Sequence, residues 1–259
     1  MLKNTVSEPT CNTQSHFRFL PYCIITAEVV IFLILETVLG YKDISRDGFG
    51  YMLYTETALQ HGWAAAAARF SSMPNYPPLL VMTMYFAGKL GLDYQICALT
   101  VNMLSIIFCS WGVLYCCRIL YRDKICALCS AMIVMSMPKL YLEGCDILRD
   151  PVYWALMVWS VALVLNMNSS EGNGVSKKYF LQITTLGILL GMCCISRKEG
   201  FFTLPLMMLA LLLFNKQSIK HKLWSLPLVV VLAAAVISLP WLLGVPWNPL
   251  KMFSLFERT

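Results

Sequence analysis

Residues 223–243 have the sequence LWSLPLVVVLAAAVISLPWLL, which contains no charged side chain. A helix needs about 20 mostly apolar residues to cross a hydrocarbon layer about 30 Å thick. This stretch meets that length, and several other apolar runs in the chain approach it. The sequence therefore indicates an integral membrane protein.

The composition supports the same conclusion. Of the 259 residues, 58% are hydrophobic and 13% are charged, whereas soluble domains carry about 25% charged residues. Most of the 11 cysteines lie inside apolar runs, which is typical of buried thiols and not of a disulfide framework. The composition thus excludes an ordinary soluble domain.

We expect an all-α transmembrane fold with about seven spans in a single membrane domain, residues 1–259. A first outer loop, residues 41–93, follows the first span. We expect its segments 48–61, 63–70 and 78–90 to lie as amphipathic helices on the membrane surface. A crossing by residues 77–92 is rejected because it would move the basic loops outside. The expected spans are residues 19–40, 94–117, 125–138, 151–167, 179–195, 200–214 and 223–243.

The distribution of charge predicts the orientation. Lys and Arg concentrate in the short connections after the second, fourth and sixth expected spans. Because such residues favour the cytoplasmic side, we expect a cytoplasmic N-terminus and explain the net charge of +6 by these loops. Most carboxylates then lie on the non-cytoplasmic face.

The first candidate site is RDGFGY, residues 46–51. Asp47 lies just beyond the first expected span, where a carboxylate can serve as a general base. The alternative is a structural Asp-Gly turn, and the local sequence by itself favours that turn.

A second candidate is GCDILRDPVY, residues 144–153, where Asp146, Arg149 and Asp150 precede an apolar run. Charges at membrane depth are costly and tend to be functional. Asp150 precedes Pro151 and could be a helix N-cap. That alternative leaves Asp146 and Arg149 unexplained.

Two further motifs lie on the same expected side. In SRKEG, residues 196–200, Arg197 and Lys198 precede Glu199 and could bind a phosphate. The alternative is that both cations reach towards lipid head groups. In NYPPL, residues 75–79, the two prolines indicate a helix start beside Tyr76.

The sequence contains no glycine-rich nucleotide loop, no histidine cluster with metal-ligand spacing and no nucleic-acid motif. We therefore expect neither a nucleic-acid partner nor a metal site built from these residue types.

The order of these motifs resembles the polytopic glycosyltransferases with the C-type fold, which include protein O-mannosyltransferases and the bacterial aminoarabinose transferases that modify lipid A. The resemblance covers nearly the whole chain. It rests on RDGFGY at 46–51, NYPPLL at 75–80, RILYRDK at 118–124, DILRDPVYW at 146–154, SRKEG at 196–200 and SLPWLL at 238–243.

The resemblance implies inverting transfer of a sugar from a polyprenyl-phosphate-linked donor on the outer face, in a bacterial inner membrane. Asp47 would be the base, and Asp150 would support the acceptor or the sugar. The remaining residues would bind substrate, with the cations stabilising the leaving phosphate. These residues are Arg46, Tyr76, Asp146, Arg149, Arg197, Lys198 and Glu199.

The chain also departs from the family's pattern. Family members often carry a second acid beside the loop aspartate, where this chain has Gly48. The resemblance allows a divalent metal as cofactor, and the missing acid counts against it. We expect the C-terminal region of related enzymes to be absent. A non-catalytic lipid-binding subunit or truncated enzyme is the alternative, and a small-molecule transporter is the third. The sequence does not identify the acceptor.

Overall fold

The computed structural model describes residues 19–39, 44–70, 78–121, 123–169, 177–214 and 219–247, and the regular structure in these ranges is helical. The helices are α1 (Leu20–Leu39), α2 (Arg46–His61), α3 (Trp63–Arg69), α4 (Pro78–Lys89), α5 (Tyr94–Leu120), α6 (Lys124–Met135), α7 (Pro138–Gly144), α8 (Asp150–Ser169), α9 (Lys177–Ser196), α10 (Gly200–Phe214) and α11 (Ile219–Leu242).

Within the described ranges, five helices are long and apolar enough to cross a membrane: α1, α5, α8, α9 and α11. The helices α6 and α7 would together make a sixth, broken span, and α10 is a shorter apolar helix. Large apolar side chains face outwards from these helices, including Ile31, Leu213 and Val231. Such a surface suits lipid, and the chain is an all-helical membrane protein.

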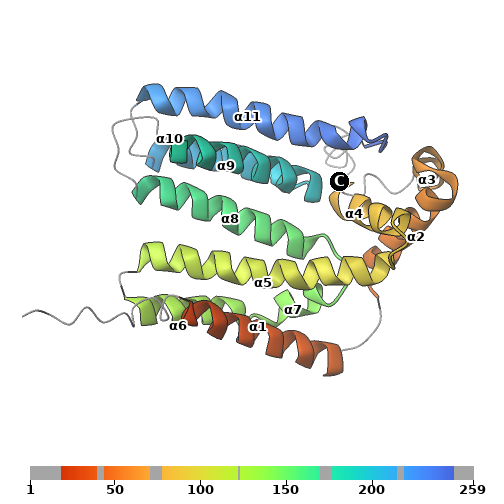
Figure 1. Ribbon diagram of the computed structural model, residues 1–259, viewed down its shortest axis with the longest axis horizontal. Helices are drawn as coiled ribbons and strands as arrows, with labels where there is room; N and C mark the ends of the chain where they lie inside the picture. Colours follow the sequence, from red (N-terminus) through yellow and green to blue (C-terminus); the bar gives the residue numbers. More distant parts are fainter. Residues whose placement is uncertain are drawn as a thin grey trace, which may run out of the picture.

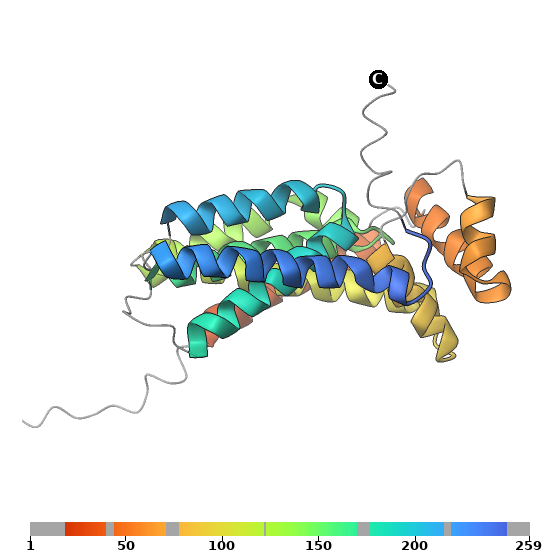
Figure 2. The same ribbon diagram turned by 90° about the horizontal axis from the view of Figure 1, so that it is seen from above.

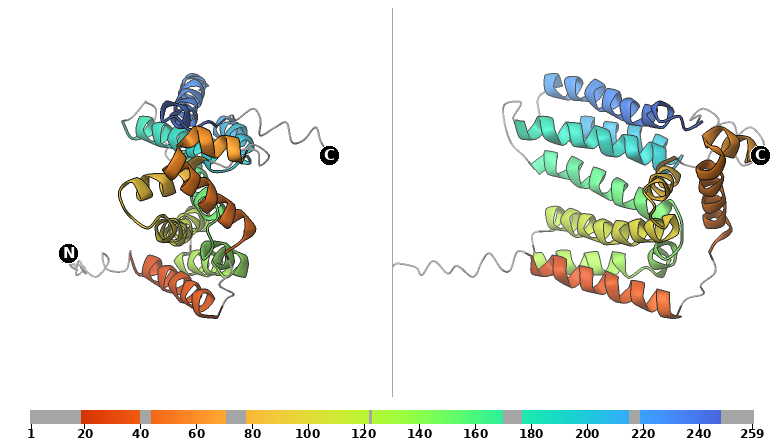
Figure 3. Two further views of the ribbon diagram at one scale, coloured as in Figure 1. Left: turned by 90° about the vertical axis from the view of Figure 1, so that its right-hand side faces the viewer. Right: turned by 45° about the vertical axis from the view of Figure 1, so that its right-hand side comes forward.

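The long helices lie side by side, and α2, α3 and α4 gather at one end of the bundle (Figure 1). Seen from above, α2 and α3 stand apart from the long helices (Figure 2). In the right-hand view of Figure 3, α2 runs across the ends of the long helices. We call this the α2–α4 end. The C-terminal ends of α5, α8 and α10 lie at the opposite end.

Close packing of α9 on α11 depends on two glycines one turn apart. A Cβ atom added at Gly187 would lie 2.8 Å from Cβ of Leu232, and one added at Gly191 would lie 2.9 Å from the Ala233 carbonyl oxygen. Small residues spaced by four let helix backbones approach in a membrane, where lipid provides no hydrophobic force between helices. The bundle is therefore tightly packed at this pair.

The third expected span, residues 125–138, differs from the structure. Helix α6 ends at Met135, and the chain bends by 59° into α7. Met137, with φ −68° and ψ 116°, precedes Pro138 at the start of α7. A residue before proline is disfavoured in the helical region, and proline lacks an N–H group. The proline therefore begins a new helix.

The segments with helical potential in the first outer loop do form helices. The expected segments at 48–61, 63–70 and 78–90 correspond to α2, α3 and α4. These helices pack on one another through a buried cluster that includes Tyr51, Tyr54, Ala66 and Met84. The α2–α4 end is therefore a packed unit with its own small core.

Candidate active site at the α2–α4 end

The start of α2 is attached to the loop between α7 and α8. The backbone N–H of Ser45 points to the carboxylate of Asp146, 3.3 Å from each oxygen, and the Ser45 hydroxyl accepts from the N–H of Gly48 at 3.1 Å. Ser45 is therefore the N-cap of α2. The Asp146 carboxylate, which also accepts from the N–H of Ile147 at 2.6 Å, adds negative charge where the helix dipole favours it.

Gly48 allows this close approach. A Cβ atom at position 48 would lie 2.9 Å from Oδ1 of Asp146 and 3.0 Å from the carbonyl oxygen of Ile147. Contacts this short require the neighbouring atoms to shift. The place that a side chain at position 48 would take is therefore occupied by the Asp146 carboxylate.

A buried amide on α5 makes a hydrogen bond to the loop between α7 and α8. Asn102 is fully buried, and its Nδ2 donates to the carbonyl oxygen of Asp146 at 2.6 Å. Its Oδ1 is buried and has no hydrogen-bond partner in the part of the chain that the structure describes. Asn102 is not among the residues predicted from the sequence, although a lone amide within an apolar helix is an available signal.

Asp47 lies in the first turn of α2, with an exposed side chain. Since Gly48 continues the helix, the alternative of an Asp-Gly turn is wrong. Arg46 is also exposed, at the first position of the helix. Across the described ranges, the Asp47 carboxylate makes no hydrogen bond or ion pair, which leaves it available to a substrate.

An ion-pair network joins α8 to the turn between α9 and α10. Arg197 Nη1 pairs with Oδ1 of Asp150, the first residue of α8. Its Nε lies 2.9 Å from Oε2 of Glu199, although these two atoms do not meet the geometry of a hydrogen bond. The Arg197 and Asp150 side chains are 27% and 14% exposed. The Arg197 side chain therefore points into the protein, and the Asp150 carboxylate links the start of α8 to the α9–α10 turn.

The backbone around Gly200 keeps this turn tight. A Cβ atom at position 200 would collide with the backbone of Cys193 and Cys194 on α9. The buried hydroxyl of Ser196 donates to the Arg149 carbonyl oxygen at 3.5 Å, which ties the turn to the start of α8. The turn that carries Arg197 is thus held against α9 and against the start of α8.

A hydroxyl pair lies directly beneath the network. The Thr203 hydroxyl donates to the carbonyl oxygen of Glu199 at 3.2 Å, and the hydroxyls of Tyr153 and Thr203 lie 2.8 Å apart. Both residues are buried. These hydroxyls connect α8 to α10 below the ion pairs.

Of the other predicted site residues, the structure describes Arg149 and Lys198 but not Tyr76. Arg149 is half-buried, and its guanidinium makes no hydrogen bond or ion pair with any described residue. Lys198 is half-buried in the same turn as Arg197. Tyr76 lies outside the described residues. The predicted residues therefore form two sets. Arg46, Asp47 and Asp146 lie at the start of α2, and Asp150, Arg197, Lys198 and Glu199 lie where α8 meets the α9–α10 turn. The loop that carries Arg149 joins the two sets.

No group of three or more His, Cys, Asp or Glu side chains that could hold a metal ion occurs within the described ranges. The charged residues of the two sets balance, with four cations and four carboxylates: Arg46, Arg149, Arg197, Lys198, Asp47, Asp146, Asp150 and Glu199. Asp150 and Glu199 neutralise Arg197, whereas no described carboxylate neutralises the half-buried Arg149.

The chain is similar to a known protein family and to a curated transferase. No solved structure matched the chain. Over 147 residues the chain is 27% identical to undecaprenyl phosphate-alpha-4-amino-4-deoxy-L-arabinose arabinosyl transferase 2 of Proteus mirabilis (strain HI4320), and the aligned part is 56% of this chain and 25% of that relative. The chain thus spans about a quarter of the relative's length. The profile of one family matches residues 98–256, more than half of the chain. The chain therefore belongs to the dolichyl-phosphate-mannose-protein mannosyltransferase family.

Proposed function

We propose that this protein transfers a sugar from a polyprenyl-phosphate-linked donor to an acceptor at the α2–α4 end of the bundle. The observation that carries the proposal is an unpaired carboxylate, Asp47, held beside a loop whose cation, Arg149, has no anionic partner among the described residues. The family and the aminoarabinose transferase relative support the class of donor.

The proposed reaction is a direct displacement with inversion at the anomeric carbon. Asp47 takes the proton of the acceptor's hydroxyl or amine as the acceptor attacks that carbon. The bond from the carbon to the phosphate oxygen breaks, and polyprenyl phosphate leaves with the electron pair. Arg149 and Lys198 stabilise the charge that develops on the phosphate, while Arg197 and Asp150 position the α9–α10 turn.

Asp146 takes the place of a second acid beside Asp47 in this proposal. Its carboxylate occupies the space that a side chain at position 48 would fill, so a carboxylate lies next to α2 although the sequence has Gly48 there. Asp146 orients the first turn of α2, and Arg46, Tyr76 and Glu199 contribute contacts to the sugar or the acceptor. A divalent metal would require ligands from the substrate or from outside the described residues.

We further propose seven spans in one membrane domain, formed by α1, α5, the α6–α7 pair, α8, α9, α10 and α11. Helices α2, α3 and α4 then lie on the outer surface of a bacterial inner membrane. Basic residues at the opposite end support this orientation because lysine and arginine favour the cytoplasmic side. Among the described residues these include Lys124, Lys177 and Lys178.

The test is to incubate the detergent-solubilised protein with a panel of polyprenyl-phosphate sugars and measure release of polyprenyl phosphate. Asp47→Asn should abolish release and retain donor binding. Glu56→Gln is the matched control, because Glu56 is an exposed carboxylate on the same helix. Release that persists in Asp47→Asn would reject Asp47 as the base. Donor binding without release from any donor would favour a non-catalytic lipid-binding subunit.

A further inference from the structure

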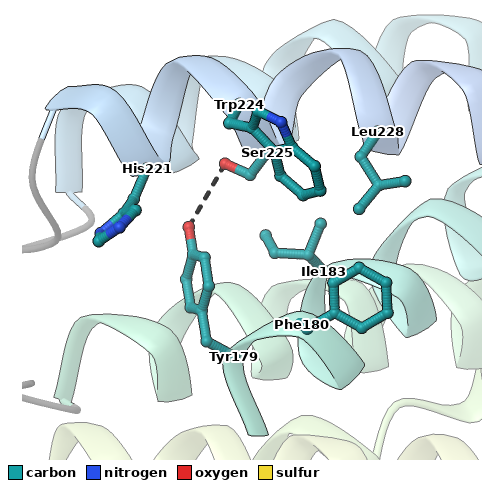
Figure 4. Close-up of a pocket in the computed structure, with 7 residues that line it drawn as sticks. All are labelled: Tyr179, Phe180, Ile183, His221, Trp224, Ser225 and Leu228. Atoms are coloured by element: carbon teal, nitrogen blue, oxygen red, sulfur yellow. Dashed lines mark hydrogen bonds between the residues drawn. The ribbon is translucent and has the colours of Figure 1, made fainter. Parts of the chain in front are cut away.

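A hollow of about 390 Å³ lies between α9 and α11, at the end of the bundle opposite the candidate active site (Figure 4). Its floor is formed by the buried residues Tyr179, Ile183 and Ser225. Phe180 and Trp224 line its sides and are 47% and 61% exposed. The hollow is therefore open to its surroundings between two aromatic side chains.

The hydroxyl groups of the floor make hydrogen bonds within the protein, and the rest of the floor is mostly apolar. The Tyr179 hydroxyl donates to Oγ of Ser225 at 3.3 Å, and that hydroxyl donates to the carbonyl oxygen of Lys222 at 2.9 Å. Ile183 completes the floor with an aliphatic surface. No polar group of the floor thus requires water, so the hollow suits a hydrocarbon chain.

Phe180 lies in the first turn of α9, and Trp224 lies in the second turn of α11. Tryptophan concentrates at the boundary between membrane and water. The hollow is therefore at the depth where a lipid's head group and the top of its acyl chains meet the protein.

Basic residues adjoin the residues of the hollow in the sequence. Lys177 and Lys178 are exposed and directly precede Tyr179, and His221 lines the hollow itself. Lys222 adds a further cation, with Nζ 2.8 Å from the Leu212 carbonyl oxygen. Neither helix has an acidic residue in its first turn. The partial positive charges of two helix N-termini add to the same field.

We propose that this hollow binds one anionic glycerophospholipid of the surrounding leaflet. One acyl chain lies between Phe180 and Trp224, and the phosphate lies beside Lys177, Lys178 and His221. The occupant is not the sugar donor, since the phosphate-binding residues proposed for that lipid lie at the other end of α9. The inference depends only on the protein's place in a membrane and stands without glycosyl transfer.

The experiment is a titration of the full-length protein in detergent with phosphatidylglycerol that carries brominated acyl chains, followed by tryptophan fluorescence. Bromine quenches a nearby indole, and we expect a saturable component that brominated phosphatidylcholine does not produce. Trp224→Phe should remove that component. Trp111→Phe is the matched control, because Trp111 is a partly exposed tryptophan on α5 and its loss should leave the component unchanged.

The charge arm uses Lys177→Gln with Lys178→Gln, which should weaken the saturable binding by about tenfold. Lys124→Gln, an exposed lysine at the start of α6 at the same end of the bundle, should have no effect. The proposal is overturned if phosphatidylcholine quenches equally, or if the double variant binds as the unmodified protein does. It is also overturned if unlabelled undecaprenyl phosphate displaces the brominated lipid at lower concentrations than unlabelled phosphatidylglycerol does.

Discussion

The amide of Asn102, buried within α5, donates a 2.6 Å hydrogen bond to the backbone carbonyl of Asp146. This contact joins the interior of a long apolar helix to the loop that receives the start of α2. The proposed base Asp47 follows Ser45, whose N–H is bound by the carboxylate of the same Asp146. The position of α2 therefore depends on a residue that no substrate needs to touch.

Replacing Asn102 should loosen the active-site end. Asn102→Ala leaves the Asp146 carbonyl oxygen without its donor, which costs about 1–3 kcal/mol when the group stays buried. We expect a lower thermal midpoint in detergent, slower release of polyprenyl phosphate and faster proteolysis between α1 and α2. Ser105→Ala is the control, because that hydroxyl bonds only within α5, to Val101. Unchanged proteolysis and activity in Asn102→Ala would contradict this role.

Position 48 should not accept a second acid. Both Gly48→Ala and Gly48→Asp introduce a Cβ atom 2.9 Å from Oδ1 of Asp146, and overpacking of this kind costs about 1–3 kcal/mol. Gly48→Asp adds repulsion between two carboxylates and should lower both stability and release of polyprenyl phosphate. Thermal unfolding and the release assay measure the two effects. Faster release in Gly48→Asp would mean that the missing acid limits the unmodified protein.

The pair of Asp150 and Arg197 should show energetic coupling. Arg197→Gln leaves the partly buried Asp150 carboxylate without its partner, and Asp150→Asn leaves Arg197 with Glu199 alone. The double variant should therefore lose less stability than the sum of the singles. A coupling energy of about 1 kcal/mol or more is expected from chemical unfolding of the four proteins. The pair of Lys139 and Glu143, in which Lys139 is 80% exposed, provides a comparison cycle with coupling close to zero. Equal coupling in both cycles would count against a structural role for Arg197.

Gly200→Ala should disrupt the turn between α9 and α10. The added methyl group would collide with the backbone of Cys193 and Cys194, which cannot move without shifting α9. We expect a loss of about 2 kcal/mol or more in unfolding free energy. Gly88→Ala is the comparison, because the nearest atom there is the end of the flexible Leu59 side chain. A smaller loss for Gly200→Ala than for Gly88→Ala would refute the account of the turn.

Much of this architecture is predictable from apolar run length, which located the long helices to within a few residues, and α2 to α4 follow from local helical potential. The break before Pro138 was missed because the flanking residues are as apolar as a continuous span. For the candidate site, charged residues at helix ends led to the prediction of Asp47, Asp150 and Arg197, and the structure brings Asp150 and Arg197 into contact. The hydrogen-bond partners of these residues were not predicted, since contacts such as that of Asn102 with Asp146 join residues that only the folded bundle brings together. The functional roles of the charged residues stay predictions.

The arrangement around Gly48 bears on how this protein can change in evolution. Gly48, Asn102 and Asp146 come from three separate stretches of sequence, yet the glycine leaves the space, the carboxylate fills it and the amide holds the loop that carries the carboxylate. A side chain at position 48 alters what position 146 can be, whereas Asn102 holds a backbone carbonyl that any residue at position 146 would offer. Across relatives positions 48 and 146 should therefore covary, and a lineage that gains a side chain at position 48 should have replaced Asp146 as well.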